Sequence, residues 1–148
     1  MELFSLNDQV EIGLGLTAVA AGQTAQYTSV IDTHGYEGIR FIVAMGTITS
    51  GAATSLKVQQ DDANATAGMA DLLGSSITIP DTASDTLFVS QYIKPGKRYL
   101  RCVVSRATQN SVINGIYYEL FRAAVVPVTH GATVTTLESH ISPVEGPA

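Results

Sequence analysis

The sequence lacks several residue types on which other classes of protein depend. It contains a single cysteine, Cys102, and no tryptophan. One cysteine can form neither an intrachain disulfide nor a cysteine-rich zinc site, so the fold has to be held together by packing. Charged residues make up only 14% of the chain, against about 25% in typical soluble domains. So little charge beside a hydrophobic fraction of 45% predicts that a partner covers part of the surface.

Basic residues are especially scarce. The chain has 8 lysines and arginines against 13 acidic residues, and its net charge of -5 argues against nucleic acid as a partner. No apolar run approaches the roughly 20 residues that span a bilayer, so we expect no membrane partner either. The first basic residue is Arg40, which means that the positively charged start of a secretory signal is missing. We therefore expect the protein to be made and kept in a cytoplasm.

Motifs for common enzyme chemistry are also missing. The sequence has no GxGxxG, GxxxxGKS/T, HExxH or GxSxG pattern, so we expect no catalytic residue and no cofactor. His34, His130 and His140 stand beside turns or in the tail, without the spacing of metal ligands. The loop that contains Asp61 and Asp62 lacks the alternating oxygen ligands and the closing glutamate of a calcium loop. We therefore expect no bound metal.

The residues that are abundant favour β-structure. Threonine, valine and isoleucine occur in short apolar runs separated by turn residues, and these runs predict about seven to nine strands in an all-β, jelly-roll-like single β-sandwich. Residues 39–45 (IRFIVAM) are nearly continuously apolar, as in a central strand that is covered on both faces. Residues 1–22 are expected to form an N-terminal arm or an edge strand, residues 23–126 the sandwich, and residues 127–148 an extended C-terminal arm.

Alternating apolar residues indicate which side chains share a face. Residues 86–93 place Leu87, Val89 and Ile93 on one face of a strand. Cys102 shares a face with Leu100 and Val104 and is interpreted as a small core residue, not as a nucleophile.

Two turns divide the second half of the chain. Residues 94–97 (KPGK) have the proline and glycine of a type II turn and predict a hairpin of the two strands that flank them. For the next turn, residues 108–111 compete with the dipeptide Asn114-Gly115. We favour 108–111, with Gly115 as a bulge, because a turn at Asn114 would leave only two apolar residues in the strand before it.

Opposite charges fall into two neighbouring blocks. Residues 58–93 contain five acidic residues and no basic one, whereas residues 94–106 contain five basic residues and no acidic one. Such a pattern predicts a homotrimer in which the acidic loop of one subunit meets the basic segment of the next, head to tail. The alternative is two solvated faces that never meet. The residues expected at this subunit interface are Asp61, Asp62, Lys97, Arg98 and Arg101.

Three longer segments are similar to a known family. Residues 35–60, 94–120 and 126–148 together resemble small head decoration, or cement, proteins that tailed phages and prophages encode beside the major capsid protein. The resemblance covers residues 27–148. It implies a β-sandwich that binds the major capsid protein on the outer surface of the phage head, commonly as a trimer, after synthesis in the bacterial host cytoplasm. The alternative is a carbohydrate- or host-surface-binding β-sandwich of a phage tail or fibre, for which a chain without tryptophan offers few aromatic residues.

The last 22 residues combine features of an arm and of a linker. Prolines and glycines interrupt any long regular element, which is typical of a disordered tail. Spaced apolar residues among threonine, serine and glutamate instead favour an extended arm that docks on a neighbouring subunit or on the capsid. The expected docking residues are Val134, Leu137, Ile141 and Val144.

Overall fold

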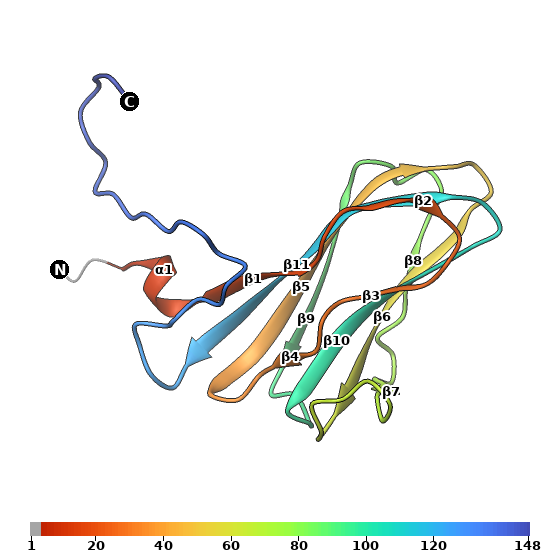
Figure 1. Ribbon diagram of the computed structural model, residues 1–148, viewed down its shortest axis with the longest axis horizontal. Helices are drawn as coiled ribbons and strands as arrows, with labels where there is room; N and C mark the ends of the chain where they lie inside the picture. Colours follow the sequence, from red (N-terminus) through yellow and green to blue (C-terminus); the bar gives the residue numbers. More distant parts are fainter. Residues whose placement is uncertain (1–3) are drawn as a thin grey trace.

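Two antiparallel sheets pack face to face in the computed structural model, which describes residues 4–148 (Figure 1). Sheet A has the strand order β1-β11-β5-β9, and β2 also pairs with β11. Its strands are β1 (Glu11–Leu16), β2 (Val19–Gly22), β5 (Tyr36–Ile48), β9 (Leu87–Ile93) and β11 (Ser111–Ala123). Sheet B has the order β3-β10-β6-β7, with β4 on β10 and β8 on β6. Its strands are β3 (Gln26–Tyr27), β4 (Ile31–Asp32), β6 (Ala53–Asp61), β7 (Ala70–Asp71), β8 (Ile77–Ile79) and β10 (Tyr99–Ala107).

The strand order is that of a jelly roll. We count each of the pairs β1/β2, β3/β4 and β7/β8 as one strand position and number the positions in chain order. The order of these positions is then 1-8-3-6 in sheet A and 2-7-4-5 in sheet B. The predicted all-β class and single β-sandwich are therefore confirmed. A short helix that was not expected, α1 (Leu6–Gln9), precedes β1. None of the helical structure in residues 4–148 has the length and apolar character of a membrane-spanning helix.

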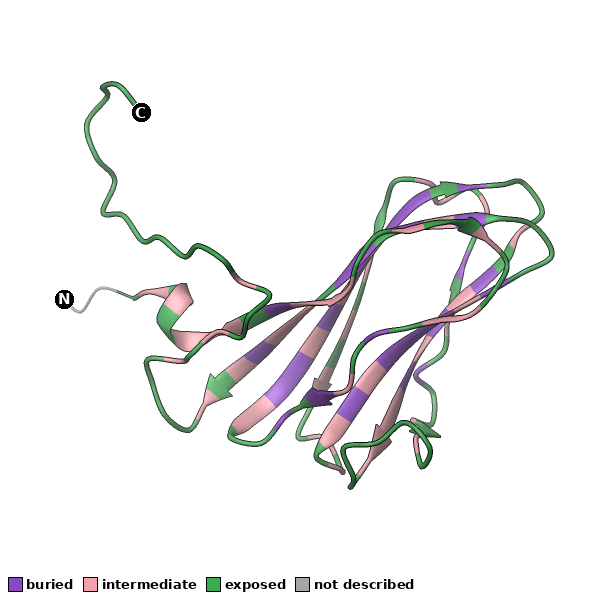
Figure 2. Cartoon of the chain, viewed as in Figure 1, coloured by how far each residue is buried: buried purple, intermediate pink, exposed green. Residues whose placement is uncertain are grey.

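The core is formed by side chains that alternate along the long strands of both sheets, as the buried segments of β5 and β10 show in Figure 2. Phe41 of β5 has no exposed surface, and Leu56, Leu100 and Cys102 of sheet B are equally buried. Burial raises the pKa of the Cys102 thiol to about 12, which keeps it protonated. The interpretation of Cys102 as a core residue is confirmed.

The strand expected to be covered on both faces is covered on one. The odd-numbered residues from Ile39 to Met45 point into the core, whereas Arg40, Ile42 and Ala44 lie on the outer face and are partly exposed. The prediction was wrong because a continuous apolar run does not reveal what covers its second face. Within one chain, sheet B covers only the first face of β5, and the second is open.

The predicted hairpin around residues 94–97 is also wrong. The strands on either side, β9 and β10, belong to different sheets, so this connection crosses the end of the sandwich. Lys94, not Gly96, has the positive φ, with a value of 51°. A type II turn needs that conformation at its third residue, which would be Gly96. Each strand instead presents one face to the shared core from opposite sides.

The preferred position of the second turn is confirmed. The chain leaves β10 after Ala107 and begins β11 at Ser111, and β11 then runs straight through Asn114 and Gly115. Gly115 has φ 147°, and the register of β11 with β5 shifts between Ile113 and Gly115, as a bulge requires.

One residue of the basic block lies inside the sandwich. Arg106 is 5% exposed and has backbone carbonyl groups as its hydrogen-bond acceptors. Its Nε donates to the oxygen of Thr24 at 2.8 Å, and Nη1 donates to those of Ala20 at 3.0 Å and Ser111 at 2.6 Å. Burial lowers the pKa of the guanidinium, but an arginine stays charged. Arg106 thus joins the segment between β2 and β3 to the start of β11.

Candidate docking site

One row of side chains on the outer face of sheet A is apolar across the whole sheet. Val89, Ile42, Tyr117 and Leu14 are successive partners on β9, β5, β11 and β1, and they form one uninterrupted apolar row. Neighbouring rows add further apolar side chains on the same face. We call the following set the apolar face: Ile12, Leu14, Ile42, Leu87, Val89, Ile93, Tyr117 and Phe121.

The part of the apolar face on β9 is the most exposed. Leu87, Val89 and Ile93 are 64%, 49% and 59% exposed, respectively. The charged residues Arg40 and Glu119 lie opposite each other in the next row, and Arg40 Nε donates to Glu119 Oε2 at 2.9 Å. This pair neutralises itself, so it adds no net charge to the surface. An exposed apolar surface without net charge is typical of an interaction site.

The outer face of sheet B is polar by contrast. Lys57 and Gln59 of β6 alternate with buried residues, and Lys57 Nζ lies 2.8 Å from Asp71 Oδ2. Arg101, one of the residues predicted at a subunit interface, donates from Nε to Gln59 Oε1 at 2.7 Å, and its guanidinium lies 4.6 Å from the centre of the Tyr27 ring. These polar groups contact one another within the chain.

The first part of the C-terminal tail covers the outer edge of β1. The N–H of Ile12 donates to His130 Nδ1, and the N–H of Leu14 donates to Thr133 Oγ1, both at 3.2 Å. His130 Nε2 lies 2.9 Å from the carbonyl oxygen of Asn7. Because Nδ1 accepts a hydrogen bond, Nε2 carries the proton and donates it to Asn7. The tail therefore satisfies two N–H groups at the edge of β1 with the side chains of His130 and Thr133.

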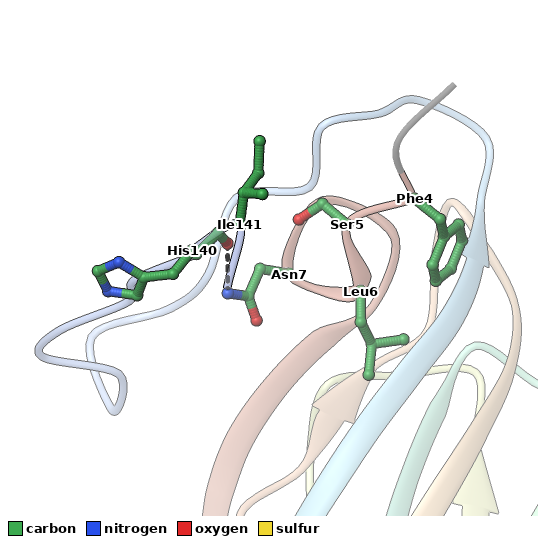
Figure 3. A pocket seen from close by; sticks show the side chains of 7 residues that line it. Phe4, Ser5, Leu6, Asn7, His140 and Ile141 are labelled. Atoms are coloured by element: carbon green, nitrogen blue, oxygen red, sulfur yellow. Dashed lines mark hydrogen bonds between the residues drawn. The ribbon is translucent and has the colours of Figure 1, made fainter. Parts of the chain in front are cut away.

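Helix α1 holds the next part of the tail. Asn7 Nδ2 donates to the carbonyl oxygen of Glu138 at 2.9 Å and to Ser139 Oγ at 2.8 Å. Figure 3 shows Asn7 facing the tail, whereas Phe4 and Leu6 point away from it. Phe4 and Leu6 are 76% and 61% exposed, so this end of the molecule also carries apolar surface.

Beyond this contact the tail leaves the sandwich (Figures 1 and 2). The predicted docking residues become more exposed along it: Val134 is partly buried, Leu137 is 43%, Ile141 79% and Val144 94% exposed. Val134 lines a shallow groove beside the apolar face, together with Leu14 and Tyr117. The tail thus has a base fixed on its own chain and an end with apolar side chains in solvent.

The residues predicted to join subunits find partners in their own chain. Lys97 Nζ lies 3.3 Å from Asp62 Oδ2, so the acidic and basic blocks meet within one molecule. Arg98 donates two hydrogen bonds to Asp32, from Nε and from Nη2, and each nitrogen lies 2.8 Å from a different carboxylate oxygen. These hydrogen bonds lower the pKa of the Asp32 carboxyl. Asp61 Oδ1 accepts the N–H of Asp62 at 2.7 Å.

Lys97 and Asp62 form an ion pair within one chain, so the two charge blocks meet here without a second subunit. The head-to-tail trimer interface stays a prediction, and the intrachain partners remove the main reason for it.

The sequence prediction missed two features of this site. Leu87, Val89 and Ile93 were placed on one face, but alternation could not say that this face is the outer one, because Phe88 and Tyr92 make the other face apolar too. The contact of His130 with β1 joins residues 118 positions apart and leaves no local pattern.

In residues 4–148 no group of three or more histidine, cysteine, aspartate or glutamate side chains is placed to hold a metal ion. The described residues combine an exposed apolar sheet face with a tail whose end is exposed. No family model matches this sequence, and no curated protein is similar enough to it to indicate a relationship.

Proposed function

We propose that this chain is a head decoration protein of a tailed phage or prophage, which binds the major capsid protein on the outer surface of the head and stabilises it. The observation that supports the proposal best is the C-terminal arm. Ile141 and Val144 are almost fully exposed on a segment whose base is hydrogen-bonded to β1 and α1.

An arm of this construction is suited to docking. Apolar side chains spaced along an extended segment can enter pockets of a second surface while the backbone follows it. Because Asn7 and the edge of β1 already hold the base of the arm, only the end beyond Ser139 has to be ordered on binding. A smaller loss of conformational entropy leaves more of the contact energy for affinity.

The proposed role needs contact area and no catalysis. A decoration protein adds buried area between neighbouring capsid subunits, and many weak contacts act together on one particle. The apolar face and the arm supply two separate surfaces for this purpose.

A carbohydrate-binding tail module has less support. Exposed aromatic rings would have to share one platform to stack on a sugar. Tyr27 is on β3 of sheet B and Tyr117 is on β11 of sheet A, so these two exposed rings lie on opposite faces. We therefore keep capsid binding as the single proposed function.

The test uses undecorated heads assembled from a major capsid protein, which the proposal expects to be encoded beside this chain. Purified wild-type protein is expected to sediment with these heads and to saturate at a fixed number of copies. A triple variant, Leu137→Ser/Ile141→Ser/Val144→Ser, should fold normally and lose binding. The control is Leu73→Ser, which removes a fully exposed leucine from the loop before β8 and should bind like the wild type.

Each outcome decides a different part of the proposal. Absence of wild-type binding to the heads would reject capsid decoration. Full binding of the triple variant would reject the arm as the docking element and leave the apolar face as the remaining candidate.

A further inference from the structure

The edges of the two sheets are protected unequally. The outer edge of β1 is capped by His130 and Thr133 of the tail. Sheet B ends on one side in β3 and β4 and on the other in β7 and β8, which are only two or three residues long. Short or covered edges are the usual means by which β-proteins avoid pairing with other chains. The remaining edge, β9, has neither protection.

Strand β9 is an edge strand of 7 residues without charge. Its sequence, LFVSQYI, contains no charged residue and no proline, and among the described residues it pairs only with β5. Its exposed side chains, Leu87, Val89 and Ile93, belong to the apolar face. A long, apolar and unprotected edge favours pairing with another strand.

The hydrogen bonds of β9 with β5 define which backbone groups are free. The N–H of Lys94 donates to Glu37 O at 2.7 Å, and the oxygen of Thr86 accepts from Met45 N at 3.0 Å. In an antiparallel strand the N–H and C=O of one residue point to the same side, and this side alternates along the chain. Even-numbered residues therefore face β5, and the odd-numbered residues of β9 point their backbone groups at the open edge.

We infer that β9 pairs antiparallel with β9 of a second copy, around a two-fold axis at Ser90. This register places Leu87 opposite the partner's Ile93 and Val89 opposite the partner's Gln91. All odd-numbered residues then form hydrogen-bonded pairs, about eight hydrogen bonds in total. The two A sheets become one continuous sheet, and the two apolar faces join on the same side of it.

Charge complementarity supports a second copy as the occupant. Asp85 and Lys94 flank β9, are exposed, and form no ion pair with any residue from 4 to 148. Both have positive φ, 59° and 51°, so the chain turns away at each end of the strand. In this register Lys94 of one copy lies opposite the partner's Thr86, one residue from the partner's Asp85, and the same approach of opposite charges occurs twice in the dimer. The strand is thus complementary to itself in backbone, shape and charge.

The inference does not depend on capsid binding, and the test is the mass of the full chain in solution. Sedimentation of the wild type over a range of concentrations should give a monomer-dimer equilibrium. Gln91→Pro removes one N–H from the open edge without touching the ladder to β5, so it should abolish the dimer. Gln91→Thr keeps that N–H and should leave the dimer intact. Equal thermal unfolding of the two variants checks that both are folded.

A charge swap tests the orientation independently of proline. Lys94→Asp places two carboxylates side by side and should reduce the dimer fraction, and adding Asp85→Lys should restore it. A wild type that stays monomeric, or one with the mass of a trimer, overturns the two-fold pairing. A dimer that Gln91→Pro leaves unchanged overturns the β9 edge as its site, and a swap that fails to restore the dimer overturns the register.

Discussion

The two outer faces of the sandwich have the same place in the fold and opposite chemistry. Sheet B presents Lys57, Gln59 and Arg101, which contact neighbouring polar groups. Sheet A presents Leu87 and Ile93, which contact solvent. Folding requires only that the inner faces be apolar, and both sheets meet that need. Folding therefore does not explain why the outer face of sheet A is apolar. Exposed apolar surface of this kind is typical of an interface.

The largest expected effect compares two neighbours on β5. Phe41 points into the core and Ile42 into the apolar face. Phe41→Ala should lower the free energy of unfolding by about 3 to 5 kcal/mol and abolish folding or assembly, because it leaves a cavity. Ile42→Ala should cost about 1 kcal/mol or less in the isolated chain, because solvent already reaches that side chain. Denaturant titration measures both, and equal losses would contradict a strand covered on one face.

Cys102→Ser should have the next largest effect. A hydroxyl in the apolar interior lacks the partners it has in water, so the substitution should cost about 1 to 3 kcal/mol. In the native wild type, a thiol reagent should react with Cys102 only as fast as the chain unfolds, since the thiol is buried and protonated. Because the chain has one cysteine, the labelling rate needs no correction for other sites. Rapid labelling would contradict its burial.

A fluorescent dye that binds apolar surface should distinguish the two faces directly. Native protein should bind the dye, and Val89→Lys/Ile93→Lys should remove most of the signal because it charges the exposed end of the apolar face. Thr78→Lys on β8 of sheet B is the matched control and should leave the signal unchanged. Equal dye binding by both variants would show that the dye detects something other than sheet A.

The smallest effect concerns the polar contacts at the edge of sheet B. Arg98 lowers the pKa of Asp32, so the ion pair stabilises the fold at neutral pH and loses this effect as the pH falls through the lowered value. Asp32→Asn should cost less than about 1 kcal/mol at pH 7, because both side chains are nearly half exposed. The difference from the wild type should vanish once Asp32 is protonated. A difference that persists in strong acid would assign the effect to something other than charge.

The sequence was sufficient wherever one face of a strand is apolar and the other polar. Leu56 and Lys57 illustrate this case, because their polarity alone decides which one enters the core. The all-β class, the core position of Cys102 and the bulge at Gly115 also follow from local patterns.

Prediction failed where both faces of a strand are apolar or where the decisive contact is distant. Phe88 and Val89 are equally apolar, so only the packing of the two sheets decides that Phe88 lies against the core. Residues 94–97, which follow β9, have the local sequence of a hairpin turn, although β9 and β10 belong to different sheets. For the charge blocks, the sequence indicated that Asp62 and Lys97 attract each other but not that a single chain brings them together.

The contact between the tail and β1 can be followed by hydrogen exchange at two amide groups. Two amide groups, those of Ile12 and Leu14, donate to side chains of the tail and not to a neighbouring strand. The tail can therefore detach from this edge without breaking any strand pairing, and detachment would open these two amides to water. Their hydrogen-exchange rates record how long the base of the arm stays in place, while the amides of β5 record the stability of the sandwich. Free protein and bound protein can be compared on this scale residue by residue.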